Sequence, residues 1–372
     1  MAGKKRTANY ELLRSLAMAM VILLHFLSRS GRLVELDEPL SPERLVGTAV
    51  EAFSLMAVNT YVLISGYFGV KSAFKPTKAV ALLCRIWFYA LLVPAALMLA
   101  GMPTAFSDQG VYGALQYLFP IETEHYWFAT SYFMLYLLTP ALNGAVRGMT
   151  QKQLQITLAG LMVLFCGIKS FCPVAFAFDR YGYDLPWFIC VYLLAAYLGR
   201  FGCSFLEKWG WPLYIGSAAG SFGVNLGMYF LREKGECFRY YFTVPFHYNF
   251  VLCLTGALGL FYGFARVSIK EGWLAGVIRR LGALSFGVYL LHEHVDLRGK
   301  WYGWLKVLVN PGGNPGMGYF LLELISCTGI LFMAGIAIDW LRGRLFQGAR
   351  RVLGKTPLAR ELKKLDGYFA LK

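Results

Sequence analysis

The sequence predicts an all-α fold, in which a polytopic bundle of helices crosses a lipid bilayer about ten times. Three observations lead to this prediction: hydrophobic residues make up 57% of the 372 residues, charged residues only 15%, and long apolar runs recur along the chain. Soluble domains carry about a quarter charged residues, so this composition excludes a soluble enzyme. The aromatic content of 16% excludes a disordered chain. The remaining class is a helical protein that buries its apolar surface in lipid.

Ten apolar segments are long enough to span a bilayer, which takes about 20 residues each. They cover residues 10–30, 46–70, 79–101, 126–143, 153–170, 185–204, 211–231, 242–265, 277–297 and 318–341. A further apolar segment near residues 110–119 is too short to span, and we expect it to be interfacial or re-entrant.

Ten spans place both termini on one side of the bilayer, and the basic residues predict that this side is the cytoplasm. The net charge is +15, from 36 Lys and Arg against 21 Asp and Glu, and this orientation concentrates the basic residues inside. The charge therefore indicates membrane topology, and no nucleic-acid partner is expected. We interpret residues 1–341 as a transmembrane domain and 342–372 as a basic cytoplasmic tail attracted to anionic lipid. The first span follows Lys4, Lys5 and Arg6, lacks a small-residue cleavage site and is expected to be retained.

The cysteines and one series of four glycines indicate packing and no chemistry. The eight cysteines form no CxxC pair and no Cys/His metal spacing, so no metal site is expected. Small-xxx-small spacing, which allows two helices to approach closely, is typical of membrane helix contacts. One predicted span shows this spacing at Gly216, Gly220, Gly223 and Gly227.

The first span carries ionisable residues that are costly in hydrocarbon and therefore indicate a functional site. Arg14 and His25 are eleven residues apart, about three helical turns, so they share one helix face roughly 16 Å apart. Glu11 lies one turn from Arg14 and can pair with it. His25 is the candidate proton-transfer group, because an imidazole titrates near neutral pH. The alternative for Arg14 is snorkelling to the inner interface.

Candidate substrate-binding residues lie in two other predicted spans. Ser285, Tyr289 and His292 follow i, i+4, i+7 spacing and share one face of the ninth span. We interpret the following Glu293, His294 and Asp296 as a hydrated helix end. Trp127 opens the fourth span on the outer side, where an aromatic belt is an alternative explanation.

A third group is cationic and lies at the predicted inner mouth. Lys75 and Lys78 precede the third span and Arg85 enters it. These side chains could hold the phosphates of a donor, although ordinary inner positive charge explains them equally well.

Four motifs, in order along the chain, resemble the acyltransferase-3 family of bacterial integral membrane O-acyltransferases. They are Glu11-Leu-Leu-Arg14 with the Arg-x10-His pair ending at His25, Leu63-Ile-Ser-Gly-Tyr-Phe68, Trp127-Phe-Ala-Thr followed by Leu135-Tyr-Leu-Leu-Thr-Pro140, and Ser285-Phe-Gly-Val-Tyr-Leu-Leu-His292.

The resemblance implies transfer of an acyl group, often acetyl, from cytoplasmic acyl-CoA to a hydroxyl of an envelope or exported glycan or lipid-linked sugar. It implies a multi-pass protein of the bacterial cytoplasmic membrane. His25 matches the family's essential histidine and Arg14 its basic partner, while Glu11 stands where many members have Asp. The family's Arg-x-x-Arg near the third span is missing, and Lys75, Lys78 and Arg85 are the nearest basic groups. Some members carry an additional extracytoplasmic domain, so a separate envelope-biosynthesis partner is a further expectation.

Two other functions use similar residues and stay open from the sequence. A transporter or flippase of an envelope precursor would also need polar groups inside the membrane, although paired Gly/Pro interruptions are not evident. A sensor or scaffold of an envelope complex would not require His25. The residues also leave open whether His25 acts as a general base or relays the acyl group covalently.

Overall fold

The computed structural model describes residues 7–174, 177, 179–354 and 356–369. Within these residues all regular secondary structure is helical and no strand occurs, so the predicted all-α class is confirmed. The basic residues Lys4, Lys5 and Arg6 and the last three residues of the predicted tail lie outside the described residues.

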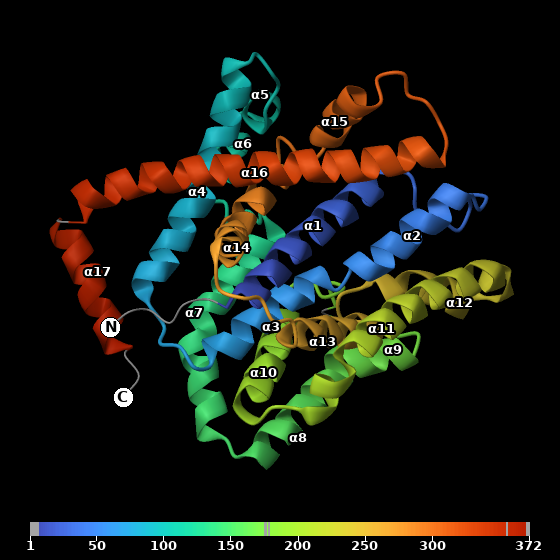
Figure 1. Ribbon diagram of the computed structural model, residues 1–372, viewed down its shortest axis with the longest axis horizontal. Coiled ribbons are helices and arrows are strands. Elements are labelled where there is room, and N and C mark those ends of the chain that lie inside the picture. The colour runs from blue at the N-terminus through green and yellow to red at the C-terminus, as the bar shows by residue number, and fades with distance from the viewer. Residues whose placement is uncertain (1–6, 175–176, 178, 355, 370–372) are drawn as a thin grey trace.

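The helices form one assembly around a buried centre (Figure 1). In the first half of the chain they are α1 (Ala8–Ser30), α2 (Pro42–Ser54), α3 (Ala57–Gly69), α4 (Pro76–Leu99), α5 (Ala105–Gln109), α6 (Val111–Leu118), α7 (Trp127–Gly148), α8 (Gln151–Met162), a π-helical turn η1 (Val163–Gly167) and α9 (Ile168–Phe171). In the second half they are α10 (Leu185–Phe201), α11 (Ser204–Leu231), η2 (Arg232–Lys234), α12 (Glu236–Thr243), η3 (Val244–Phe246), α13 (Val251–Ala265), α14 (Trp273–His292), α15 (Trp301–Val309), α16 (Met317–Leu353) and α17 (Pro357–Tyr368).

Seven helical stretches among the described residues are long and apolar enough to cross a membrane. They are Ala8–Ser30, Pro42–Gly69, Pro76–Leu99, Gln151–Phe171, Glu236–Ala265, Trp273–His292 and Met317–Arg351. The protein is therefore a multi-pass membrane protein. Three other predicted spans coincide with α7, α10 and α11, which are helical but shorter or less apolar, so the count of ten stays a prediction.

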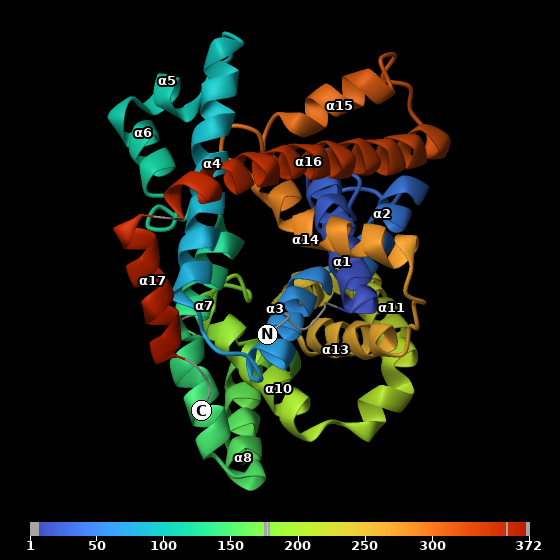
Figure 2. The same ribbon diagram turned by 60° about the vertical axis from the view of Figure 1, so that its left-hand side comes forward.

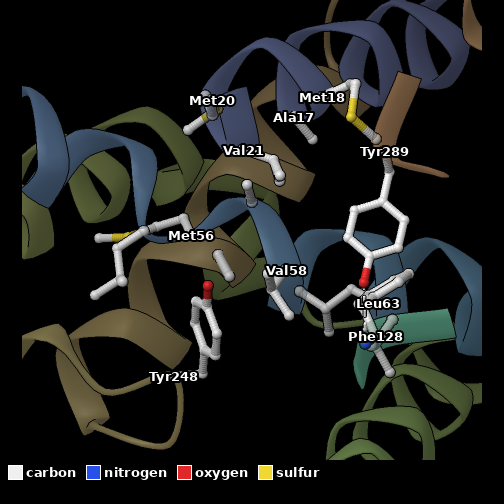
Figure 3. Close-up of a cluster of buried hydrophobic side chains, with 14 of the residues drawn as sticks. Ala17, Met18, Met20, Val21, Met56, Val58, Leu63, Phe128, Tyr248 and Tyr289 are labelled. Atoms are coloured by element: carbon white, nitrogen blue, oxygen red, sulfur yellow. Dashed lines mark hydrogen bonds between the residues drawn. The ribbon is translucent and has the colours of Figure 1, made fainter. Parts of the chain in front are cut away.

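The core lies where α1, α3, α13 and α14 meet. Met18 and Val21 of α1 face Val58 and Leu63 of α3, and the ring of Tyr289 from α14 points toward Phe128 at the start of α7 (Figure 3). Helix α13 is buried around nearly its whole circumference, as expected of an apolar helix in the centre of a bundle.

Two glycines of α14 allow its neighbours to approach closely. A Cβ at Gly282 would lie 2.6 Å from the backbone oxygen of Glu11 in α1. A Cβ at Gly287 would lie 2.5 Å from Asp339 in α16. Any larger residue at either position would overlap these atoms. Glycine at these two positions therefore sets how α1 and α16 pack on α14.

The close packing predicted from the glycines of α11 is largely wrong. A Cβ at Gly216, Gly223 or Gly227 would meet no atom within 4 Å, and one at Gly220 would meet only Leu252. Helix α11 instead approaches α13 at a glycine outside that series, because a Cβ at Gly210 would lie 2.6 Å from the backbone nitrogen of Gly263. Regular spacing alone did not identify the face that packs.

The C-terminal segment continues the last span and folds back on α4. Helix α16 passes without a break through the predicted tail boundary at 341, and α17 lies beside α4 (Figure 2). The carboxylate of Asp366 accepts hydrogen bonds from the backbone nitrogen of Thr77 at 3.0 Å and from its hydroxyl at 2.7 Å. The tail is therefore docked on the first turn of α4.

Candidate active site

The C-terminal ends of α1 and α14 bring two histidines, a carboxylate and a guanidinium together, at what we call the outer end. Nδ1 of His25 lies 2.9 Å from Nε2 of His292 and 3.2 Å from a carboxylate oxygen of Glu293. The guanidinium of Arg29 donates to that same oxygen at 3.0 Å and to the backbone oxygen of His25 at 3.0 Å. We call these four residues the outer histidine cluster.

The hydrogen-bond pattern assigns the ring hydrogens of this cluster. Nδ1 of His292 lies 2.6 Å from the backbone oxygen of Val288, and a carbonyl only accepts, so this nitrogen carries hydrogen. Nε2 of the neutral His292 ring then accepts, and Nδ1 of His25 is the donor between them. The side chain of His25 remains 21% exposed, whereas His292 is fully buried. Nε2 of His25 therefore carries no hydrogen and keeps a free lone pair, while the contact of Nδ1 with His292 holds the ring in place.

Three side chains of the outer histidine cluster also have the composition of a metal site. Ligand atoms of His25, His292 and Glu293 all lie within 4.8 Å of one another, which the cysteine spacing could not indicate. Arg29 already neutralises Glu293, and the two rings already share a hydrogen bond. The cluster is therefore satisfied as a hydrogen-bond network, and a cation there would have to displace Arg29.

The predicted hydrated end of α14 is wrong. Glu293, His294 and Asp296 are 8%, 0% and 5% exposed. Glu293 packs against His25 and Arg29 of α1. Helices α5 and α6 and the loop before α7 cover the segment that follows it. Asp296 accepts from the backbone nitrogen of Ala105 at 2.7 Å and from the hydroxyl of Tyr117 at 2.8 Å. The segment after α14 is therefore a buried anchor for the outer helices.

A second pair of histidines belongs to this anchor. His125 donates from Nδ1 to the backbone oxygen of Gln116 and accepts at Nε2 from the backbone nitrogen of Val295. His294 donates from Nε2 to the backbone oxygen of Ala90 and accepts at Nδ1 from the nitrogen of Asp296. Burial lowers the pKa of both His125 and His294 to about 3, and in His125 the neighbouring His294 lowers it further. Both rings are neutral, with every ring nitrogen used.

A cavity of about 530 Å³ opens at the outer end and reaches the outer histidine cluster through Glu293. Its volume lies in the range of small-molecule sites. Five aromatic side chains line it: Tyr126, Trp127, Tyr181, Tyr183 and Tyr289. The ring of Trp127 packs 4.6 Å from that of Tyr183, and the hydroxyl of Tyr289 accepts from the backbone nitrogen of Phe128 at 3.2 Å. Aromatic faces beside polar groups suit a sugar ring.

The inner end of the same helix pair holds the other predicted polar residues of the first span. Arg14 donates to the carboxylate of Glu11, which is almost fully buried against Gly282. The hydroxyl of Tyr61 donates to the backbone oxygen of Arg14 at 2.6 Å. Ser285 donates to the backbone oxygen of Gly282 at 2.9 Å and does not line the cavity. The structure thus places Ser285 with Glu11 and Arg14, and places Tyr289, His292 and Trp127 at the outer end.

The three predicted donor-binding residues do not form one group. Lys75 and Lys78 are exposed at the start of α4. Arg85 lies further along α4, where its guanidinium donates to both oxygens of Asp339 at 3.1 and 2.7 Å. Arg342 donates to the same carboxylate from the other side. Arg85 is therefore part of a buried Arg–Asp–Arg arrangement that joins α4 to α16.

The sequence did not identify Glu293 or Arg29 as candidate site residues. Glu293 and Arg29 are separated by 264 positions and meet only because α1 and α14 run side by side. Arg29 is spaced i, i+4 from His25 and could have been found from that spacing.

Comparison with known protein families gives a match. A protein-family model described as an acyltransferase domain matches residues 7–343, nearly the whole chain. No curated protein and no solved structure matches the chain. The family match confirms the resemblance that the four sequence motifs indicated.

Proposed function

Because the chain belongs to the acyltransferase-3 family and is a multi-pass membrane acyltransferase, we propose that it moves an acyl group, with acetyl as the first candidate, from cytoplasmic acyl-CoA to a glycan hydroxyl. The acceptor would be an envelope or exported glycan or a lipid-linked sugar, and the location the bacterial cytoplasmic membrane. The observation that carries the proposal is the bare Nε2 of His25, on a ring that contacts Glu293 in the wall of a cavity lined with aromatic side chains.

His25 has the geometry of a general base supported by a carboxylate. When Nε2 takes the proton of the acceptor hydroxyl, the ring becomes positive, and Glu293 at 3.2 Å from Nδ1 stabilises that charge. The hydroxyl oxygen forms the ester bond as the thioester C–S bond breaks, and the proton passes to the CoA sulfur. A covalent route would use the same nitrogen, with the acyl group first on Nε2.

The inner end would receive the donor. Lys75 and Lys78 stand at the N-terminus of α4, where two exposed lysines at the positive end of the helix dipole favour phosphate. Arg14, paired with Glu11, lies about 16 Å from His25 along α1, so it would meet the donor and not the acceptor. We assign Arg85 to the framework, because Asp339 holds its guanidinium.

The test is acyl transfer by the purified protein in lipid nanodiscs, with acetyl-CoA labelled in the acetyl group and an envelope glycan fraction as acceptor. We expect His25→Ala to lower the rate by about 10²–10⁴-fold, the usual effect of removing a general base. His247→Gln is the control for loss of an imidazole. His247 lies outside the cluster but packs against Tyr181 of the cavity wall, so kcat should be retained even if KM changes. A wild-type rate in His25→Ala would overturn the base role. Movement of a glycan precursor without consumption of acyl-CoA would identify a transporter.

A further inference from the structure

The charges around the outer cavity do not balance, and the imbalance concerns one arginine. Three carboxylates line the cavity, and each has its own cation. Glu124 pairs with Arg180 at 3.0 Å. Asp179 pairs with the buried Lys169.

The third carboxylate, Glu293, pairs with Arg29 at 3.0 Å and also contacts His25. The acidic residues of the lining are therefore neutralised within the protein. They do not need a cationic ligand.

Arg298 is the remaining cation of the lining, and its guanidinium makes no hydrogen bond or ion pair with any residue that the structure describes. It is exposed, and it shares the cavity wall with Tyr126 and Tyr289. A guanidinium is always charged and presents a planar set of donors that matches the two oxygens of a carboxylate or phosphate. The lining thus combines aromatic faces with one uncompensated positive charge.

We propose that the acceptor is a sugar that carries an oxyanion, either a carboxylate or a phosphate, and that Arg298 binds this group in the outer cavity. The proposal rests on the proposed function, because it names the class of acceptor that His25 would serve. Glu293 lines the same cavity and contacts Nδ1 of His25, so a sugar held by its anion at Arg298 would lie beside the carboxylate that supports the His25 ring. Arg298 is in this sense a specificity-determining residue.

A binding experiment tests the proposal without requiring turnover. Calorimetric titration of the protein in nanodiscs, at low salt, compares methyl glucoside with methyl glucuronide and glucose 6-phosphate. One charged hydrogen-bonded contact corresponds to about a tenfold difference in Kd, so at least one anionic sugar should bind about tenfold more tightly than the neutral one. Whichever anionic sugar binds more tightly distinguishes a uronate from a phosphate.

The variant Arg298→Gln should abolish the preference and leave the weak binding of methyl glucoside unchanged. Arg298→Lys should retain part of the preference, because the charge remains and the planar fork is lost. Arg239→Gln is the matched control, since Arg239 in α12 does not line the cavity and its loss should change nothing. Equal binding of neutral and anionic sugars, or a preference that persists in Arg298→Gln, would overturn the proposal.

The acyl-transfer assay separates this inference from the proposed function. If the protein acylates neutral and anionic acceptors with equal KM, and Arg298→Gln leaves both unchanged, the function stands and the role of Arg298 fails. If the preference in binding is present but acetyl-CoA is never consumed, the role of Arg298 stands and the transferase proposal fails.

Discussion

Two histidine clusters lie near each other at the outer end, built from the same residue types with different consequences. His25 and His292 meet Glu293, while His125 and His294 lie beside Asp296. In the second cluster each ring nitrogen has a partner, and the carboxylate holds α5 and α6. In the first, His25 keeps one nitrogen open.

This difference teaches that residue type alone does not identify a reactive histidine. Membrane histidines are functional candidates by default, but a buried ring whose two nitrogens serve the backbone can take no further proton or substrate. The open Nε2 of His25 and the cavity next to Glu293 are what separate the two clusters chemically.

Replacing the carboxylate of each cluster in turn should give the largest difference in kcat between the two clusters. Glu293→Gln keeps the shape but removes the charge that stabilises protonated His25, so we expect kcat to fall by about 10²-fold with little change in KM. Asp296→Asn should leave kcat of the folded protein unchanged and lower its thermal stability, because it weakens the hydrogen bonds to Tyr117 and Ala105. Steady-state kinetics and thermal unfolding of both variants check this. Equal loss of kcat in the two variants would remove the distinction between the clusters.

A smaller effect should appear in the pH dependence of stability. The pKa values of His125 and His294 are lowered from 6.5 to about 3 in the folded protein, so between these limits the unfolded chain binds more protons. The free energy of unfolding is then fully retained above pH 6.5. It falls as the pH drops, by up to about 1.4 kcal/mol per pH unit for each ring.

Thermal unfolding between pH 7.5 and 4.5 measures this effect. The double variant His125→Gln, His294→Gln should be less stable at pH 7.5 and should lose less stability than wild type on acidification. A variant that loses as much as wild type would show that these two rings do not carry the dependence.

The sequence predicted the parts of the fold that depend on local pattern. Composition and apolar run length predicted the helical membrane class, and spacing along one helix predicted the pairing of Glu11 with Arg14. His25 and His292 were both identified as candidates because an ionisable side chain inside a span is costly and therefore indicates a function. The sequence did not show that these two rings touch, since nothing local relates positions 267 residues apart.

The remaining differences come from tertiary burial. The sequence predicts that Glu293 belongs to a hydrated helix end because charged residues follow it. In the structure Glu293 packs against His25 and Arg29 of α1 instead. The sequence indicates Arg85 as a candidate for binding the donor, because its partner Asp339 lies 254 residues away in the chain. Long-range partners decide whether a charged residue is available for a ligand, and spacing within one segment cannot reveal them.

The most direct measurement of the central claim is the position of the ring hydrogen on His25. Nitrogen-15 NMR of histidine-labelled protein in nanodiscs distinguishes a protonated from a bare ring nitrogen, and His25→Ala assigns the signals. The hydrogen bonds predict that Nδ1 of His25 carries hydrogen and Nε2 is bare. A hydrogen on Nε2 would contradict the account, because the nitrogen facing away from His292 and Glu293 could then accept neither a proton nor an acyl group.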